Sequence, residues 1–379
     1  MKKLFLFFSA LILLFFLGNL VFAQDTPIVP EKKELLVGRV VNVISDKEEI
    51  SQTQGSQDLT FRNQILEIKI TKGTIKDRIV TAENDYYPLK NNQKVYLVYS
   101  IIEGQEEFSY PYPVRIPYMI LLLIVFFLAI VFFAKKQGFK SFLTIILSLF
   151  IVFLFVLPQI NKGQPPVLVA LLAGFIIIIA TLYFVYGWNK KTHAALLGTT
   201  TSLLLVYILS ILFSALICLT GQANEQAIHI RFLLGDLIDL RGLLLATIII
   251  GSIGALNDVA VDQSSTVFAL KEAGSHLKFK ELYNKAIVVG KDHLLATINT
   301  LVLAYIGIAL PLLLVVGSFN DLPLIYILNN EIFAEEITKT LLASIGLIAV
   351  TPITTFFAVL LAFKQKKYKP TETKNINIE

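Results

Sequence analysis

The feature that most constrains this chain is a series of long apolar stretches in its last two thirds. Hydrophobic residues make up 55% of the 379 residues and charged residues only 16%, whereas a soluble globular protein carries roughly a quarter charged residues. Most of the stretches reach the 18 to 20 residues that a helix needs to cross a bilayer. They lie at 117–134, 139–158, 166–186, 193–219, 242–256, 293–316 and 337–363. We therefore expect a polytopic α-helical membrane protein with about seven transmembrane helices in residues 114–369, followed by a tail at 370–379.

The first 23 residues have the pattern of a targeting segment. Lys2 and Lys3 precede an apolar run at 4–22, and the run ends in Val21-Phe22-Ala23, which places small or branched residues where a signal peptidase reads the chain. This pattern is typical of a secretory signal peptide. Because the run is long for a signal peptide, an uncleaved signal anchor is the alternative. Either one exports the residues that follow.

Residues 24–113 have a different composition, with apolar and polar positions alternating in short runs. The runs lie near 36–43, 65–70, 79–80 and 95–98, and turn residues such as Gly73 and Asn91-Asn92 separate them. A period of two with turn signals predicts strands. We expect a small exported all-β domain with an OB-like barrel topology. Such a barrel could bind a ligand, and a purely structural ectodomain is the alternative.

The basic residues predict an orientation. With the β domain outside, fourteen lysines fall on the inner side and five basic residues fall on outer loops or span edges, which is a clear positive-inside bias. The inner set is Lys135, Lys136, Lys140, Lys190, Lys191, Lys271, Lys278, Lys280, Lys285, Lys291, Lys364, Lys366, Lys367 and Lys369. An odd number of spans then gives a cytoplasmic C-terminus. The net charge of +5 reflects this orientation, so the expected partner is the lipid bilayer of the cell membrane and not a nucleic acid.

Two carboxylates stand out inside an apolar region. Asp258 and Asp262 follow the short stretch 242–256 and its glycines, Gly251 and Gly254. On a helix they are i,i+4 neighbours on one face. A carboxylate in a membrane segment costs about 2.5 to 3.5 kcal/mol or more, which favours a functional role. The alternative is that both aspartates lie in a solvated cytoplasmic loop.

A second polar pattern begins the sixth stretch. Small and polar residues recur there every three or four positions, and Asn299 lies to one flank; the stripe is His293, Thr297, Thr300, Ala304, Gly307 and Pro311. Stripes of this kind let membrane helices pack closely, which is one interpretation. The functional interpretation docks the stripe against Asp258 and Asp262, so that Thr and Asn oxygens complete a hydrated polar pocket.

The same residues carry a family resemblance. The segments 254–265 (GALNDVAVDQSS), 290–293 (GKDH) and 299–305 (NTLVLAY) resemble the signature of the YibE/F family of bacterial multi-pass membrane proteins. The family pattern commonly has Asp-Asp where this chain has Asn257-Asp258, and often Ser or Thr-x-Gln where it has Asp262-Gln263. The resemblance therefore supports Asp258 and Gln263 more than Asp262. It implies an integral membrane protein and no particular activity.

These patterns favour a secondary transporter or permease for an ion or small solute. This hypothesis is based on an expected discontinuous span, in which glycines and carboxylates meet the polar stripe of the sixth stretch. Some transporters bind solutes at broken helices of this kind. The sequence contains no nucleotide-binding P-loop, so an ion gradient or a separate ATPase would supply the driving force. The expected solute- or ion-binding residues are Asp258, Asp262, Gln263, Asn257, Thr297, Asn299, Thr300 and His293.

Two other functions compete with transport. In one, the chain is a non-catalytic membrane scaffold or sensor whose exported β domain binds an envelope partner. In the other it is an intramembrane aspartyl protease, but Asp236 and Asp258 fall on opposite sides of a span, whereas such an enzyme needs two aspartates that share a proton. Cys218 is the only cysteine, and the four histidines are not spaced as a zinc site. We therefore expect no catalytic residue, no metal and no cofactor.

Overall fold

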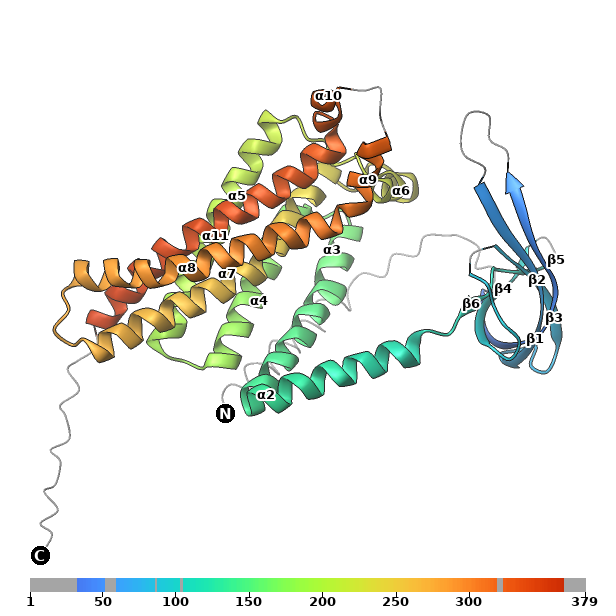
Figure 1. Cartoon of the computed structure of the whole chain (residues 1–379), viewed down its shortest axis with the longest axis horizontal. Coiled ribbons are helices and arrows are strands. Elements are labelled where there is room, and N and C mark those ends of the chain that lie inside the picture. The colour runs from blue at the N-terminus through green and yellow to red at the C-terminus, as the bar shows by residue number, and fades with distance from the viewer. Residues whose placement is uncertain (1–32, 52–58, 86, 103–104, 319–322, 365–379) are drawn as a thin grey trace, which may run out of the picture. The chain divides into compact units, whose positions relative to one another are not determined.

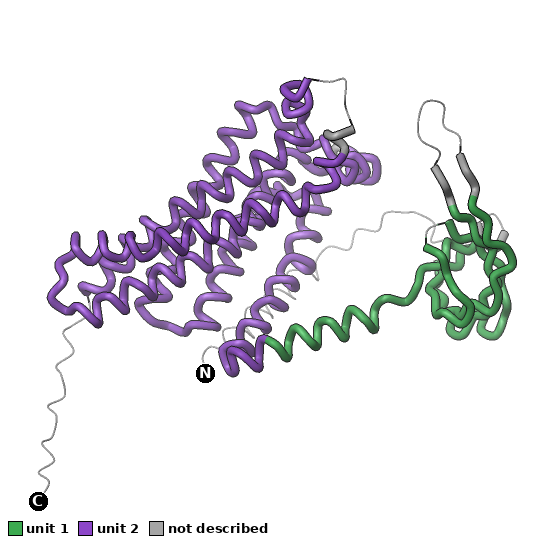
Figure 2. Tube along the Cα trace, in the orientation of Figure 1, with its two compact units in different colours: residues 1–129 green, residues 130–379 purple. Residues whose placement is uncertain are grey.

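A computed structural model describes residues 33–51, 59–85, 87–102, 105–318 and 323–364. The chain divides into two units, residues 1–129 and residues 130–379 (Figure 2). The expected signal segment at 1–23 and the tail at 370–379 lie outside the described residues.

The first unit contains the predicted β domain. Its strands are β1 (Glu34–Ser51), β2 (Leu59–Lys72), β3 (Ile79–Asn84), β4 (Lys94–Ile102), β5 (Gln105–Phe108) and β6 (Tyr112–Pro113). They form one antiparallel sheet in the order β3-β2-β1-β4-β5, with β6 paired to β4 (Figure 1). Alternate residues of the strands point into one core, as the period of two predicts; its fully buried members include Leu36, Leu66, Ile68, Ile70, Val95 and Leu97.

The sheet curls so that its two edges come close to each other. Arg78, directly before edge strand β3, forms an ion pair of 2.7 Å with Glu106 of edge strand β5. The Tyr99 hydroxyl donates to the same carboxylate at 3.1 Å. The Arg78–Glu106 pair crosses the gap between the edges, while Tyr99, on the neighbouring strand β4, holds the Glu106 carboxylate from its own side. The domain is therefore a near-barrel.

The remaining described residues are almost entirely helical. The helices are α2 (Ile116–Ile151), η1 (Val152–Val156), α3 (Leu157–Asn161), α4 (Pro166–Tyr186), α5 (Lys190–Leu216), α6 (Glu225–Leu234), η2 (Gly235–Leu237), α7 (Leu240–Ala273), α8 (Phe279–Ile308), α9 (Leu310–Ser318), α10 (Leu324–Leu328) and α11 (Glu331–Phe363). Within the described part of the chain, six helical runs are long and apolar enough to cross a membrane: residues 116–161, α4, α5, α7, α8 and α11.

The first of these runs is not straight. Lys135 has φ 49° and ψ −126°, which is not helical, and a Cβ on Gly138 would collide with the carbonyl oxygen of Ile130. In a straight helix, eight residues are separated by about 12 Å along the axis. The chain therefore folds back at Lys135, between the first two apolar stretches of the sequence.

The fifth stretch differs from our expectation of a short, discontinuous span. That prediction is wrong, because α7 is one continuous helix of 34 residues that includes Gly251, Gly254, Asp258 and Asp262. A glycine inside a helix costs only about 1 kcal/mol relative to alanine. Much of α7 is buried against its neighbours, and this packing outweighs that cost.

Helices α5, α7 and α11 pack side by side and form the core of the second unit (Figure 1). Small residues allow their backbones to approach closely, as is usual between membrane helices. Gly198 of α5 lies against Thr354 of α11, and Gly346 of α11 lies against Val206 of α5. α4 and α8 pack on α7 from outside this core, with Gly174 of α4 against Ile253.

The bond between Arg78 and Glu106 gives a pH-dependent prediction for the β domain. Hydrogen bonds from Arg78 and then from Tyr99 hold the pKa of Glu106 below its ordinary value of 4.5. A lowered pKa in the folded state stabilises the fold above pH 4.5, and this contribution is lost as the pH falls through the lowered value. Glu106→Gln should therefore speed hydrogen exchange of β3 and β5 amides at pH 7, and this effect should shrink as the pH falls below 4.5 through the lowered pKa.

The measurement is hydrogen exchange of the full-length protein, with variant and wild type compared at each pH. Glu107→Gln, on the same strand, is the matched control and should exchange like wild type. Equal exchange of Glu106→Gln and wild type at pH 7 would show that the ion pair does not hold the two edges together.

Candidate functional site

The aspartates of α7 lie near the end at which α5 begins. The Ser264 hydroxyl donates to the backbone carbonyl of Lys191 at 2.8 Å, which fixes the register between α7 and the start of α5. Asp262 is two residues before Ser264 and Asp258 is six, or about 3 Å and about 9 Å further along the helix axis. Measured from the end of the helical unit at which α5 begins, Asp258 therefore lies further inside than the Lys190-Lys191 pair. Asp262 lies close to the level of that pair.

Asp262 meets the first residue of the polar stripe on α8. Nε2 of His293 is 3.0 Å from Oδ2 of Asp262, and the two side chains are 52% and 61% exposed. Asp258 lies one helical turn from Asp262 and within electrostatic range of both Asp262 and His293. The structure thus brings together three of the sequence-predicted site residues.

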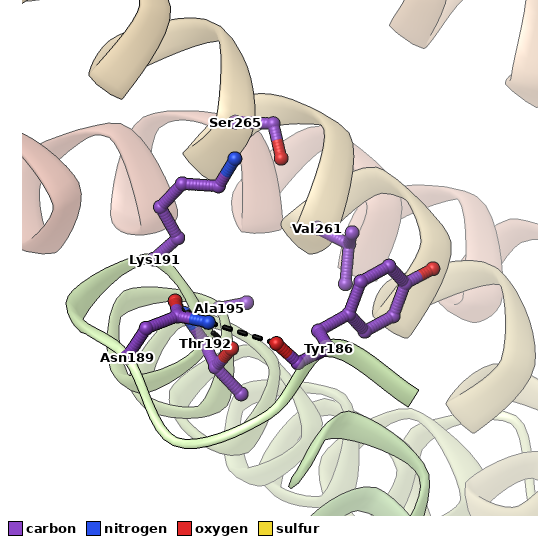
Figure 3. Close-up of a pocket in the computed structure, with 7 residues that line it drawn as sticks. All are labelled: Tyr186, Asn189, Lys191, Thr192, Ala195, Val261 and Ser265. Atoms are coloured by element: carbon purple, nitrogen blue, oxygen red, sulfur yellow. Dashed lines mark hydrogen bonds between the residues drawn. The ribbon is translucent and has the colours of Figure 1, made fainter. Parts of the chain in front are cut away.

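A polar cavity of about 140 Å³ lies between α7 and the connection from α4 to α5 (Figure 3). The residues that line it are Tyr186, Asn189, Lys191, Thr192, Ala195, Val261 and Ser265. Tyr186 lies within electrostatic range of Asp258 and Asp262. A space of this size holds several water molecules or a small solute.

The start of α5 is fixed by a cap, and the cap positions the cavity wall. Oδ1 of Asn189 accepts from the backbone N–H of Thr192 at 2.9 Å and from the Thr192 hydroxyl at 3.1 Å. A side chain that caps the first turn in this way stabilises a helix by about 1 kcal/mol. The amide of Asn189 also donates to the Tyr186 carbonyl at 2.8 Å, which ties the end of α4 to the start of α5.

The single tryptophan stands at the same connection. Trp188 stacks on Tyr183 with ring centroids 4.4 Å apart, and His193 meets its ring edge-on at 4.9 Å. Aromatic clusters of this kind are enriched where helices leave the bilayer. Trp188 is thus adjacent to Asn189, which lines the cavity.

Gln263 has a different environment from the aspartates beside it. It is 3% exposed, and its amide donates to the Ala286 carbonyl of α8 at 3.0 Å and to the Thr355 hydroxyl of α11 at 2.7 Å. Gly290 of α8 lies directly against this amide, where a Cβ would collide with it. Gln263 therefore joins three helices and requires a glycine opposite.

The other predicted residues are placed apart from the Asp262–His293 contact. The hydroxyls of Thr297 and Thr300 donate to the carbonyls of His293 and Ala296 within α8 itself, and Asn299 is exposed. Asn257 is buried on α7, and its Oδ1 has no hydrogen-bond partner among the described residues. Of the stripe on α8, His293 alone is in the ion pair with Asp262.

The sequence reasoning did not find the wall formed by Tyr186, Asn189, Lys191 and Thr192. Their signal was the cap pattern of Asn189 and Thr192 beside a lysine pair, which we used only for topology. It also did not single out Glu335 of α11, which is 2% exposed and lies 3.8 Å from Nζ of Lys339. Among the described residues, no three His, Cys, Asp or Glu side chains gather as a metal site would require.

The helical unit and its polar residues define an integral membrane protein with several membrane-spanning helices. A family model described as YibE/F-like protein matches residues 122–364. The chain therefore belongs to the YibE/F-like family, as its sequence pattern indicated. No curated protein and no solved structure matches the chain.

The position of Gln263 predicts a loss of stability when its amide is removed. Gln263→Leu keeps most of the volume but leaves the Ala286 carbonyl without this donor, so the free energy of unfolding should fall by about 1–2 kcal/mol. Gly290→Val should be at least as harmful because it forces α7 and α8 apart. Thermal or denaturant unfolding of the purified protein in detergent measures both effects.

Gln226→Leu is the matched control, because Gln226 is exposed on α6. It should leave the unfolding midpoint unchanged. A Gln263→Leu protein as stable as this control would mean that the two hydrogen bonds contribute nothing to holding the helices together.

Proposed function

We propose that this chain is a secondary transporter or permease for a small ion or solute, and that it is not an enzyme. One observation carries the proposal: two carboxylates and an imidazole come together on helices apolar enough to span a membrane, and Tyr186, which lines a polar cavity, lies within electrostatic range of both carboxylates. Ionisable groups in membrane helices are costly and usually mark ion or substrate pathways. Apart from the ion or solute, the partner that this function requires is the lipid bilayer.

The groups around the cavity suit a small charged or zwitterionic solute. Asp258 and Asp262 offer negative charge, Lys191 offers positive charge, and Tyr186, Thr192 and Ser265 offer hydroxyls. A solute or ion bound at the carboxylates would relieve the repulsion between two like charges four residues apart. His293 already contacts Asp262 at 3.0 Å, so a solute that binds Asp262 would compete with this contact.

The proposed topology has seven crossings. The fold-back at Lys135 divides residues 116–161 into two apolar segments, which together with α4, α5, α7, α8 and α11 make seven. The OB-like β domain, exported by the signal peptide or signal anchor at 1–23, then lies outside the cell, and the C-terminus lies in the cytoplasm. In support, the segment ends that this topology places on the cytoplasmic side carry lysines, as the positive-inside rule requires. They are Lys135, Lys136, Lys190, Lys191, Lys271 and Lys278.

The single cysteine tests this topology without an engineered background. Cys218 is exposed and follows the end of α5, on the outer side in the proposed arrangement. A membrane-impermeant maleimide should therefore label wild-type protein in intact cells. Ser275→Cys in a Cys218→Ser background, between α7 and α8, should be labelled only after the membrane is permeabilised.

Cys218→Ser alone is the blank and should not be labelled. The reverse pattern, with position 275 labelled in intact cells and Cys218 protected, would invert the orientation and contradict the proposed topology.

The single tryptophan provides the test of solute binding. Full-length protein in nanodiscs would be titrated with a panel of monovalent and divalent cations, phosphate, carboxylates and amino acids while Trp188 emission is recorded. We expect at least one compound to change the emission saturably, and Asp258→Asn or Asp262→Asn to weaken that compound about tenfold or more, since each removes a charged contact. The same compound should then enter proteoliposomes that contain wild type faster than those that contain the variants.

Asp292→Asn is the matched control, because Asp292 is exposed on α8 next to His293. It should bind and transport like wild type. If no compound changes the emission, and Asp258→Asn is as stable as wild type, the carboxylates are merely solvated and transport by this site is refuted.

A scaffold or sensor is the second candidate, and the surface of the β domain favours it. Large apolar side chains lie exposed on its strands: Leu35 is 61%, Ile44 is 52% and Ile79 is 57% exposed. Exposed apolar patches commonly mark protein interaction sites. Capture of an envelope partner by wild type that is lost in Ile44→Lys, with no solute response, would favour this function over transport.

A further inference from the structure

A second polar cluster lies deep between α5, α7 and α11, on residues that the proposed transport site does not use apart from Asn257. Five side chains there are at least nine-tenths buried, and each has an oxygen without a hydrogen-bond partner among the described residues. They are Thr199 and Ser202 of α5, Asn257 of α7, and Thr351 and Thr354 of α11. A buried polar atom without a partner costs about 1–3 kcal/mol, so five in one region call for an explanation.

The register of the helices puts these oxygens within about two turns of one another. Asn257 is seven residues before Ser264, and Gly198 is seven residues after Lys191, to which Ser264 is bonded. Since α5 and α7 run in opposite directions, this contact places Asn257 within about a turn of Gly198, and the bond of Gln263 to Thr355 places it near Thr351 of α11. The Thr354 side chain is in contact with Gly198, with its hydroxyl closest, and so belongs to this level.

Ser202 and Thr351 lie one turn further along the same interface. Ser202 is four residues after Gly198, and Thr351 is three residues before Thr354. The next contact in this direction joins Val206 to Gly346, so α5 and α11 remain antiparallel neighbours throughout. The five oxygens therefore occupy about two turns of three packed helices.

Other hydroxyls of these helices behave differently. Thr201, Ser210, Ser344 and Thr355 each donate to the carbonyl four residues earlier, which is the usual partner of a hydroxyl in a membrane helix. Thr199, Ser202, Thr351 and Thr354 lack this bond. The exceptions lie together, which indicates a shared ligand and not random side-chain placement.

We propose that this cluster is a binding site for a dehydrated monovalent cation, Na⁺. Four hydroxyl oxygens and the Asn257 amide oxygen supply five neutral ligands. One buried water molecule makes only about 2–4 hydrogen bonds, which are too few to satisfy all five.

The ligand set also excludes a divalent cation. Ca²⁺ and Mg²⁺ sites in proteins usually include carboxylates, and the cluster contains none. The close approach of α5 and α11 at Gly198 favours Na⁺ over the larger K⁺. The site does not depend on the proposed transport function, because a bound Na⁺ would hold the three helices together in either case.

The test compares thermal unfolding of the full-length protein in NaCl, KCl and choline chloride at equal ionic strength. A ligand that binds only the folded state raises its stability in proportion to the logarithm of concentration above Kd. Na⁺ should raise Tm by about 2–6 °C over choline, with a rise that follows the logarithm of its concentration, and K⁺ should raise it less. Equal Tm values in the three salts would mean that the cluster holds water only, and would overturn the proposal.

Variants locate the effect. Thr354→Val and Ser202→Ala remove a ligand with little change of shape and should abolish most of the Na⁺-dependent rise, whereas Thr201→Val, exposed on the same helix, should retain it. If Thr354→Val does not fold, Ser202→Ala and the wild-type salt comparison still decide the question. A Na⁺-dependent rise in Tm that persists in both cluster variants but is lost in Asp258→Asn would show that Na⁺ binds at the carboxylates. That result would refute this site.

Discussion

Close approach of helix backbones is the constraint on which the helical unit depends. Lipid tails are as apolar as leucine side chains, so burial alone does not hold membrane helices together, and tight van der Waals contact must do so. Gly198, Gly290 and Gly346 provide that contact, each at a point where a Cβ would collide with a neighbouring helix. The positions of Gln263 and of the buried hydroxyls follow from these three contacts.

The two polar regions of α7 differ because the helix presents different faces to its neighbours. Gln263 and Asn257 point into the packed core and are 3% and 7% exposed, whereas the side chain of Asp262 is 61% exposed. A charge in the packed core would need full compensation by a partner. On α7 the neutral amides lie inside, and both carboxylates lie on an exposed face, where Asp262 meets His293.

Much of this arrangement could be predicted from the sequence. Apolar length predicted membrane helices, period-two alternation predicted the strands, and spacing placed Asp258 and Asp262 on one helix face. The continuity of α7 could not be read in the same way, because Gly251 and Gly254 look like a break unless the packing around them is known. The contacts of Gln263 with Ala286 and Thr355, and the cavity beside Lys191, depend on register between distant segments, which no local pattern encodes.

Neighbouring helices bury few residues of α8, and this has a consequence for motion. Glu331 of α11 accepts hydrogen bonds from the backbone N–H groups of Thr220 and Gly221 after α5, and Gly198 fixes the same two helices further along. α5 and α11 are thus joined to each other at two places. α8 is much less buried than these helices, and its buried residues end at Gly290, where it packs on Gln263. We therefore expect the part of α8 that follows Gly290 to shift most easily against α7. The Asp262–His293 pair joins α7 to this part of α8. The distance between the two side chains would therefore change whenever α8 moves.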